Sequence, residues 1–404
     1  MKTIAIVGTF DSKGKEFAFV KEIIEGLGLN TLTIHSGVFD PLFTPDISNE
    51  QVAKEVHADI DEIASKRDRA LATETLAKGM EKIIPRLYAE GKFDGILSFG
   101  GSGGTSIVTP GMRALPIGVP KIMVSTVASG DVSQYVGTSD ILMYPSIVDV
   151  SGLNSLSIKI FTNAAFAIAG MVNNKFESKI EKKPLIAASM FGVTTPCVNH
   201  AREYLEERGY EVIVFHATGA GGKTMERLIE SNFFDGVLDL TTTEWCDELV
   251  GGVLNAGPHR LEAAGKSNVP QVVSVGALDM VNFGPIDTVP EKFSSRNLYR
   301  HNPTITLMRT TIDENKELGE IISNKLNQSS SPTALLLPLK GVSAIDVEGE
   351  PFYGPDEDQT LFDTIRKKLN HSKVELVELD YAINDKEFAV KAAEKLIELM
   401  SRQK

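Results

Sequence analysis

The feature that most constrains the fold is a set of four segments that recur in the same order in both halves of the chain. Each segment is a short apolar run of the kind that forms a buried strand. The four pairs are 4–8 (IAIVG) with 186–192 (IAASMFG), 27–35 (LGLNTLTIH) with 208–216 (RGYEVIVFH), 93–97 (FDGIL) with 234–238 (FDGVL), and 119–125 (VPKIMVS) with 269–275 (VPQVVSV). Because all four keep their order, we expect the two halves to share one topology.

Helical segments separate these strands. Residues 16–27 place Phe17, Val20, Ile23 and Ile24 on one face, and further helices are expected around 49–63 and 69–90. Alternating strands and helices imply right-handed crossovers and a parallel sheet covered on both faces. We therefore predict two doubly wound, Rossmann-like α/β domains of related topology.

The predicted domains are residues 1–175 and 184–404, joined by a polar linker over 173–183 (NNKFESKIEKK). Ligands of open parallel sheets bind beyond the carboxyl ends of the strands. With two such domains, we expect the site to face a cleft between them.

Composition narrows the class of partner. The net charge of −13 argues against nucleic acid or an anionic membrane as the main partner. Only two cysteines, Cys197 and Cys246, are present, which is typical of a reducing cytoplasm. The longest apolar run, 160–172, is expected to be too short to span a bilayer. These features predict a cytoplasmic protein without a membrane segment.

The third strand of the first half leads directly into a glycine-rich stretch, Gly100–Thr105 (GGSGGT). Gly101, Gly103 and Gly104 let the backbone approach a ligand closely, and Ser102 and Thr105 add hydroxyls. A helix beginning here would add partial positive charge at its N-terminus. The stretch predicts a cradle for a phosphate or carboxylate; the alternative is a tight turn that only permits close packing of the helix on the strand.

Residues 8–13 (GTFDSK) follow the first strand. The hydroxyls of Thr9 and Ser12 and the ammonium of Lys13 suit a phosphate, and Asp11 could reach a metal or a ribose. The alternative is an ordinary polar loop in which Asp11 or Ser12 caps the next helix.

A third polar loop, 125–131 (STVASGD), follows the strand at 121–124. The hydroxyls of Ser125 and Ser129, the flexible Gly130 and the carboxylate of Asp131 suit a polar ligand or a Mg²⁺ shell. Three polar loops at the ends of three strands in one domain converge on one crevice, which strengthens the ligand interpretation of each.

Residues 217–224 (ATGAGGKT) fit a relaxed Walker A pattern between a strand and a helix, and Asp239 could serve as the Walker B acid. The pattern is loose, because alanine replaces its first glycine and the strand is the second of its domain. The alternative is a glycine-rich turn without a ligand.

Further along the second half, acids cluster with a histidine and an arginine. His259 and Arg260 could grip a carboxylate, and Asp247 or Asp279 could act as a base. The alternative for each is capping or loop packing. The chain has no zinc-ligand spacing, no Ser-His-Asp signature and no Gly-x-Gly-x-x-Gly in a dinucleotide-binding context, so NAD is not expected.

The chain resembles a large, mostly bacterial family of proteins similar to the tomato mosaic virus resistance protein of plants, known as resistance-protein-like ATP-binding-domain proteins. The resemblance covers nearly the whole sequence. Its motifs are 100–107, 113–121, 125–130, 135–140 and 145–149 in the first half, and 245–249, 256–261, 279–283 and 306–310 in the second.

The resemblance implies a homodimer of two-domain α/β subunits with ATP and Mg²⁺ held mainly by the N-terminal domain. The nucleotide contacts that it implies are Asp11, Ser12, Lys13, Arg69 and Gly101–Thr105, with help from Ser125–Gly130. Arg67 is an alternative to Arg69, and Asp11 and Asp131 are the metal candidates.

Three functions stay open at this point. The protein could bind ATP as a switch or a dimer-stabilising element. It could be an enzyme acting on a small carboxylate or phosphorylated metabolite, with Asp247, His259, Arg260 and Asp279 facing the ligand. It could also be a solute-sensing module whose two domains close on a small anionic ligand.

Overall fold

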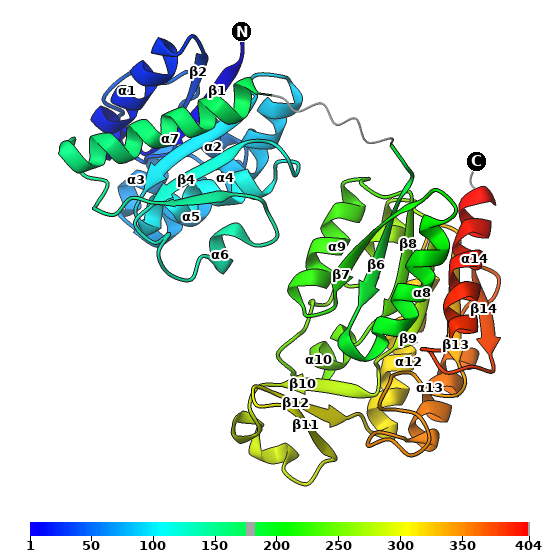
Figure 1. The fold of residues 1–404 in the computed structure, drawn as a ribbon. Helices are drawn as coiled ribbons and strands as arrows, with labels where there is room; N and C mark the ends of the chain where they lie inside the picture. Colours follow the sequence, from blue (N-terminus) through cyan, green and yellow to red (C-terminus); the bar gives the residue numbers. More distant parts are fainter. Residues whose placement is uncertain (175–181, 403–404) are drawn as a thin grey trace. The chain divides into compact units, whose positions relative to one another are not determined.

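The computed structural model of the chain describes residues 1–174 and 182–402. Contacts between Cα atoms divide it into two compact units, Met1–Lys179 and Ile180–Lys404 (Figure 1). The predicted linker at 173–183 falls largely on residues 175–181, which lie outside the described residues.

The first unit is built on a five-stranded parallel sheet with the strand order β2-β1-β3-β4-β5. Its strands are β1 (Thr3–Gly8), β2 (Asn30–His35), β3 (Gly95–Gly100), β4 (Lys121–Ser125) and β5 (Leu142–Pro145). The register places Gly100 opposite Ser125 and Val7 opposite Ser98. The carboxyl ends of β1, β3 and β4 therefore lie along one edge of the sheet.

Helices cover both faces of this sheet. Alternate strand residues such as Ile6, Leu97 and Val124 pack under α1 and α7, while Val7, Ile96 and Met123 pack under α4 and α5. The helices are α1 (Phe10–Gly26), α2 (Asn49–Lys54), α3 (Ile60–Lys66), α4 (Arg69–Ala89), α5 (Ser102–Arg113), α6 (Ser133–Val136) and α7 (Ser155–Asn173). The alternation explains why these strands are continuous apolar runs.

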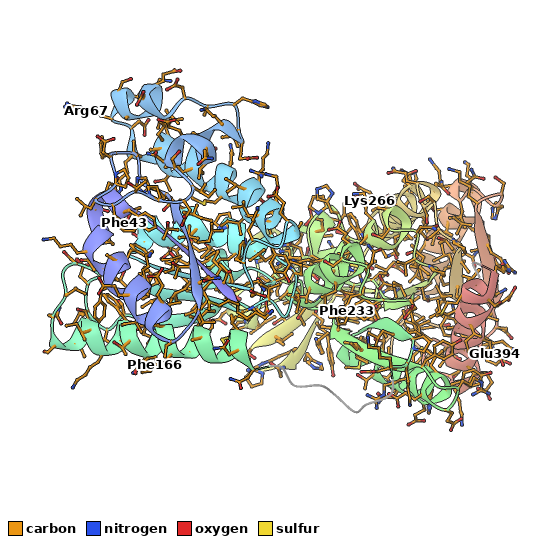
Figure 2. All side chains as sticks on the ribbon, turned by 90° about the horizontal axis from the view of Figure 1, so that it is seen from above. Phe43, Arg67, Phe166, Phe233, Lys266 and Glu394 are labelled. Atoms are coloured by element: carbon orange, nitrogen blue, oxygen red, sulfur yellow. The ribbon has the colours of Figure 1, made fainter. Side chains whose placement is uncertain are left out.

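The apolar run at 160–172 belongs to α7, and here one expectation was wrong. The helix has 19 residues and is long and apolar enough to cross a membrane by length and composition alone. Its inner face, with Phe161, Ala165 and Ile168, packs into the core beneath the sheet, and Phe166 lies on its outer side (Figure 2). Through this inner face α7 packs against the core of the first unit. A cytoplasmic location stays a prediction.

The second unit contains a six-stranded parallel sheet with the order β14-β13-β9-β8-β6-β7. Its strands are β6 (Leu185–Met190), β7 (Glu211–His216), β8 (Gly236–Thr241), β9 (Gln271–Gly276), β13 (Thr333–Pro338) and β14 (Val374–Leu379). Numbered from β6, this order repeats that of the first sheet and adds one strand at the far edge. The four sequence pairs fall on β1 and β6, β2 and β7, β3 and β8, and β4 and β9. The prediction of two doubly wound parallel-sheet domains of related topology is confirmed.

Helices also cover both faces of the second sheet. Ala188, Leu238 and Leu336 pack against α8 and α14, whereas Val273 and Leu335 pack toward α12 and α13. The helices are α8 (Thr195–Glu206), α9 (Ala220–Glu230), α10 (Glu244–Val250), α11 (Ala263–Lys266), α12 (Ile312–Asn327), α13 (Pro355–Lys368) and α14 (Lys386–Arg402), with 3₁₀ turns at Gly192–Thr194, Ile286–Thr288 and Glu291–Phe293.

The structure differs from the sequence-based expectation in three local features. A separate antiparallel sheet, in which β12 (Ile305–Arg309) lies between β10 (Met280–Phe283) and β11 (Leu298–Asn302), is an addition to the two predicted parallel sheets. The helix expected over 49–63 is two helices, because the chain turns at His57, whose φ is +56°. The first helix begins at Phe10 and not near Glu16, since Phe10 is fully buried.

Candidate functional site

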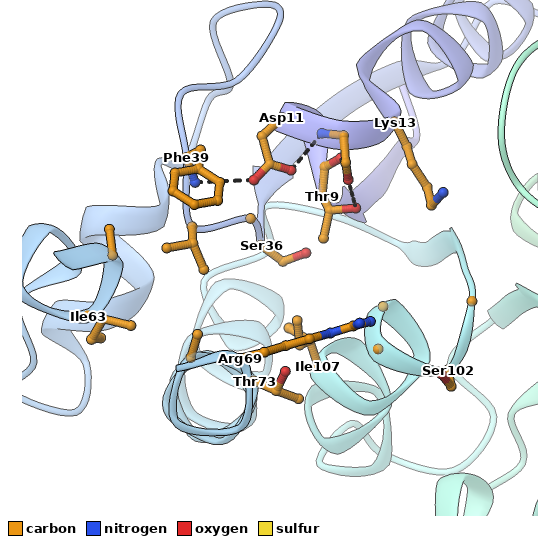
Figure 3. A pocket seen from close by; sticks show the side chains of 18 of the residues that line it. Thr9, Asp11, Lys13, Ser36, Phe39, Ile63, Arg69, Thr73, Ser102 and Ile107 are labelled. Carbon is orange, nitrogen blue, oxygen red and sulfur yellow. Dashed lines mark hydrogen bonds between the residues drawn. The ribbon is translucent and has the colours of Figure 1, made fainter. Parts of the chain in front are cut away.

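A cavity of about 830 Å³ opens at the carboxyl edge of the first sheet (Figure 3). Its walls come from the residues that follow β1, β2 and β3 and from the α3–α4 region. Of the predicted nucleotide contacts it gathers Thr9, Asp11, Ser12, Lys13, Arg69, Gly101, Ser102, Gly103 and Gly104. This is the arrangement that open parallel sheets use to bind ligands.

The glycine-rich stretch is the start of α5 rather than a free loop. Gly101 is the N-cap and makes no side-chain cap, and α5 begins at Ser102. The first backbone N–H groups of a helix have no acceptor within it, and they carry the positive end of the helix dipole. No side chain caps these donors, and the residues of this turn, Gly101 to Gly104, line the cavity.

Two cationic side chains reach the same cavity. The Nη2 atom of Arg69 lies 3.2 Å from the point where a Cβ on residue 103 would be, so the guanidinium rests against the first turn of α5. Within the part of the chain that the structure describes, Arg69 has no ion-pair partner. Lys13 donates from its ammonium to the carbonyl of Val150 and makes no ion pair there. Both cations are therefore available to an anion.

The turn after β1 forms the opposite wall. Asp11 and Ser12 lie in the first turn of α1, and the Ser12 hydroxyl donates to Thr9 Oγ1 at 3.0 Å. The carboxylate of Asp11 accepts from the backbone N–H of Ser12 at 2.7 Å and of Phe39 at 3.1 Å. The N-cap of α1 is Thr9, and no side chain caps this helix, so the predicted capping by Asp11 or Ser12 is wrong. Asp11 instead ties the start of α1 to the segment that follows β2.

Sequence reasoning missed that segment. Residues 36–39 (SGVF) line the cavity, and the backbone approaches Asp11 so closely at Gly37 that a Cβ there would lie 2.4 Å from the carboxylate. Phe39 is 65% exposed at the rim. The other lining residues that were not predicted are Ile63, Ala64, Asp68, Ala72, Thr73, Ile107 and Asp149; Arg67, the alternative to Arg69, lines the cavity too.

Several predicted contacts stand behind or outside the cavity. Thr105 and Ser125 are fully buried, and their hydroxyls bond to each other at 2.7 Å, which ties α5 to the end of β4. Ser129, Gly130 and Asp131 are exposed and do not line the cavity. Thr105 and Ser125 therefore support the first turn of α5 from behind.

The metal candidates do not form a ready-made ion site. Asp131 accepts from the backbone N–H of Ser133 at 2.9 Å, a bond that lowers the pKa of Asp131. Among the described residues there is no group of three or more His, Cys, Asp or Glu side chains that could hold a metal. Three aspartates line the cavity: Asp11, Asp149 and Asp68, of which Asp68 caps the start of α4. Mg²⁺ commonly binds through one or two carboxylates together with substrate phosphates.

The second unit uses its charged candidates internally. Arg260 is 1% exposed, and its guanidinium binds Asp239 at 2.7 Å, Glu244 at 2.8 Å and Glu226 at 3.1 Å. Burial and these charges act in opposite directions, and the net effect raises the pKa of Arg260. Its donors face carboxylates of the chain itself, so the structure assigns Arg260 and Asp239 a structural role.

The Walker-like stretch also has an internal partner. The backbone N–H groups of Gly219 and Gly222, at the start of α9, donate to Glu244 Oε1 at 2.7 and 3.1 Å. Glu244 is 1% exposed. A carboxylate of the chain thus occupies the position where a P-loop would hold a phosphate, which argues for the alternative of a turn without a ligand.

Asp247 and Asp279 have pKa values in the range of general bases but lie in closed surroundings. Burial raises the pKa of Asp247 to about 7 and that of Asp279 to about 6. The carboxylate of Asp247 accepts from the backbone and side chain of Asn282, and Ser343 donates to Asp279. His259 is exposed and pairs with Glu262. None of the three lines the first unit's cavity, and a catalytic role for them stays a prediction.

Comparison with known proteins gives the family. Residues 2–177 match the N-terminal domain, and residues 183–400 the C-terminal domain, of the "Uncharacterised protein family (UPF0261)". A UPF0261 protein of Clostridium tetani is 57% identical over 402 residues, covering 99% of this chain and 100% of the relative. UPF0261 protein RA0729 of Rhizobium meliloti is 46% identical, covering 96% of this chain and 97% of the relative.

A plant protein of the predicted group is also similar to this chain. The ToMV resistance protein Tm-1(GCR237) of Solanum lycopersicum is 40% identical over 421 residues, which cover 98% of this chain and 56% of that protein. The resemblance to this group is therefore confirmed. The names of these relatives state no ligand, so ATP binding, magnesium and the homodimer stay predictions.

Proposed function

Because the chain belongs to the uncharacterised protein family UPF0261 through both of its domains, we propose its function from the cavity itself: the first unit binds a nucleotide. The observation that carries this proposal is the open first turn of α5. Its backbone donors, the Arg69 guanidinium and the Lys13 ammonium border one cavity, and no carboxylate of the described chain pairs with Arg69. Such a surrounding suits phosphate groups.

Apolar residues in the lining of the cavity suit a base. Val38, Phe39, Ile63 and Ile107 supply apolar surface, and Phe39 offers an exposed ring at the rim. A cavity of about 830 Å³ falls within the range of small-molecule and cofactor sites. The combination favours a ligand with an anionic end and a flat apolar end, which describes a nucleotide better than a small carboxylate.

ATP is the nucleotide that the family resemblance implies, and magnesium would enter with its phosphates. Asp11 and Asp149 would then be the protein's carboxylate ligands or water contacts. The ion would offset charge on the phosphates, and the protein's own residues would hold and orient them.

Isothermal titration calorimetry of the full chain with ATP, ADP, AMP and adenosine, each with and without MgCl₂, tests the proposal. We expect the nucleotides to bind more tightly than adenosine. Gly103→Val places a side chain against Arg69 and the α5 donors, and should lower nucleotide affinity at least about tenfold. The absence of both heat and a thermal shift with every nucleotide would remove the proposal.

A matched control is Gly170→Val in α7. A Cβ at Gly170 meets nothing within 4 Å, so this variant makes the same helix substitution in the same unit away from the cavity. Equal loss of binding in both variants would indicate a general effect on folding.

A further inference from the structure

One buried polar group at the cavity has no role in holding the fold together. The side chain of Ser36, directly after β2, is fully buried, and its hydroxyl has no hydrogen-bond partner among the described residues. Ser36 lines the cavity, and Figure 3 shows its oxygen directed into the space between α1 and Arg69. A buried hydroxyl left without a partner is costly, and one that also lines a cavity can be satisfied there by a ligand atom.

The backbone around Ser36 is fixed before any ligand arrives. The N–H of Ser36 donates to the carbonyl of Gly8 at 2.8 Å, which joins the segment to the end of β1. Asn49 holds the neighbouring Gly37 carbonyl at 2.9 Å from the other side. The Ser36 hydroxyl is therefore presented by a rigid segment.

His35 completes this support from beneath. Its Nδ1 accepts from the backbone N–H of Phe10 at 3.1 Å and of Gly37 at 3.3 Å, and its Nε2 donates to the carbonyl of Phe39 at 2.9 Å. The ring also stacks on Phe10, with centroids 5.5 Å apart. His35 thereby joins the start of α1 to the segment that carries Ser36.

We propose that Ser36 is a specificity-determining donor that selects phosphate-bearing ligands. The hydroxyl donates to a phosphoryl oxygen that the first turn of α5 and Arg69 bind from the opposite side. The inference rests on the proposed nucleotide site and extends it, because it assigns the discrimination between nucleotide and nucleoside to one uncharged, buried group. A hydrogen bond from a fixed donor to a charged oxygen gives such selectivity.

The test compares Ser36→Ala with Ser98→Ala. Ser98 in β3 is the matched control, since it too is fully buried with an unpartnered hydroxyl, yet it does not line the cavity. Neither substitution removes a hydrogen bond within the described protein, so both variants should unfold at temperatures close to that of the wild type.

Calorimetry then measures AMP, ATP, adenosine and inorganic pyrophosphate on each protein. We expect Ser36→Ala to lower the affinity for AMP or ATP by about 10- to 100-fold while changing that for adenosine less than about threefold. Ser98→Ala should bind all four as the wild type does. Unchanged nucleotide affinity in Ser36→Ala, or equal loss in both variants, overturns the inference.

Pyrophosphate separates this inference from the proposed function. If the wild type binds pyrophosphate in a Ser36-dependent way but no nucleotide, the phosphate-selecting role holds and the nucleotide proposal fails. If the wild type binds neither, both fail.

Discussion

The helix after the third strand begins in opposite ways in the two units. In the first unit α5 begins with Gly101, Ser102 and two further glycines, and its donors face a cavity. In the second unit α10 begins with Glu244, whose carboxylate is buried against the start of α9. The two units thus share one topology, but the sheet edge of the first unit is open to an anion, whereas the equivalent edge of the second unit already holds a carboxylate of the chain.

The arginines of the two units differ in the same way. Arg69 lies against the first turn of α5 and has no carboxylate partner among the described residues, whereas Arg260 is surrounded by Asp239, Glu244 and Glu226. Three acids around one buried arginine repel a further anion. We infer that the sign and the pairing of a few side chains, rather than the strand order, decide which edge accepts a ligand.

Removing the second unit's central cation should have the largest effect. Arg260→Met leaves the buried carboxylates of Asp239 and Glu244 and the half-buried one of Glu226 without their counter-charge. We expect a loss of about 3–5 kcal/mol in the free energy of unfolding. Urea denaturation followed by circular dichroism measures it. The matched change in the first unit, Arg69→Met, should leave stability within about 0.5 kcal/mol. Equal losses would contradict the comparison.

Adding one methyl group to each helix start sharpens the contrast. A Cβ at Gly222 would lie 2.1 Å from a Glu244 oxygen, so Gly222→Ala should cost about 1–3 kcal/mol of stability. Gly103→Ala meets only the end of the Arg69 side chain, and alanine is the better helix former, so stability should hold or rise. Thermal unfolding of both variants measures the two changes in stability. A larger loss of stability in Gly103→Ala than in Gly222→Ala would contradict the comparison.

Charge removal at the open edge should weaken binding without weakening the fold. We expect Arg69→Met to lower ATP affinity by about 10- to 100-fold and to reduce its dependence on salt. Lys15→Met is the control, since Lys15 is an exposed cation of α1 that does not line the cavity. Calorimetry at two salt concentrations measures both. A similar loss in Lys15→Met would mean that overall charge, and not the site, attracts the ligand.

The smallest expected effect is a pH dependence confined to the second unit. Burial raises the folded-state pKa of Asp247 to about 7 and that of Asp279 to about 6, both above the value of 3.8 for an unperturbed aspartate. The folded state therefore binds more protons than the unfolded state, so the contribution of these groups to stability falls as pH rises from about 4 to about 7. We expect the unfolding temperature to be a few degrees lower at pH 8 than at pH 6.

Asp279→Asn checks the source of that dependence. The amide cannot ionise. Between pH 5 and pH 7 the free energy of unfolding should therefore fall by about 1–3 kcal/mol less in the variant than in the wild type. The exposed Asp287→Asn serves as the control. An identical slope in wild type and Asp279→Asn would show that other groups set the pH dependence.

Much of the fold was predictable because buried strands leave continuous apolar runs. The strand at 121–125 and the four repeated segments appear where the sequence placed them. The helix boundaries were less predictable, because tertiary contacts decide them. Phe10 begins α1 early since it packs between Phe17 and Phe43, and the turn at His57 has no strong signal in composition.

The candidate site was predictable only in part. The glycine-rich and hydroxyl-rich composition after β1 and β3 made those residues predictable. Most of them line the cavity, whereas Thr105 lies behind it, and their roles stay predictions. Ser36 gave no signal, because one serine after a strand is unremarkable until its burial is known. The pairing of Glu244 with Gly219 and Gly222 joins residues more than 20 positions apart, which only the folded chain reveals.

The position of α7 at the end of the first unit has a consequence for synthesis. All five strands of that unit end by residue 145, yet the face that carries Leu97, Ile122 and Val124 is closed by α7, which ends at residue 173. A chain growing on the ribosome therefore carries a complete but half-covered sheet for about thirty residues of translation, and N-terminal domains generally fold first. During that interval the nascent chain presents an apolar surface that chaperones recognise, and a messenger truncated before this helix would yield an aggregating product.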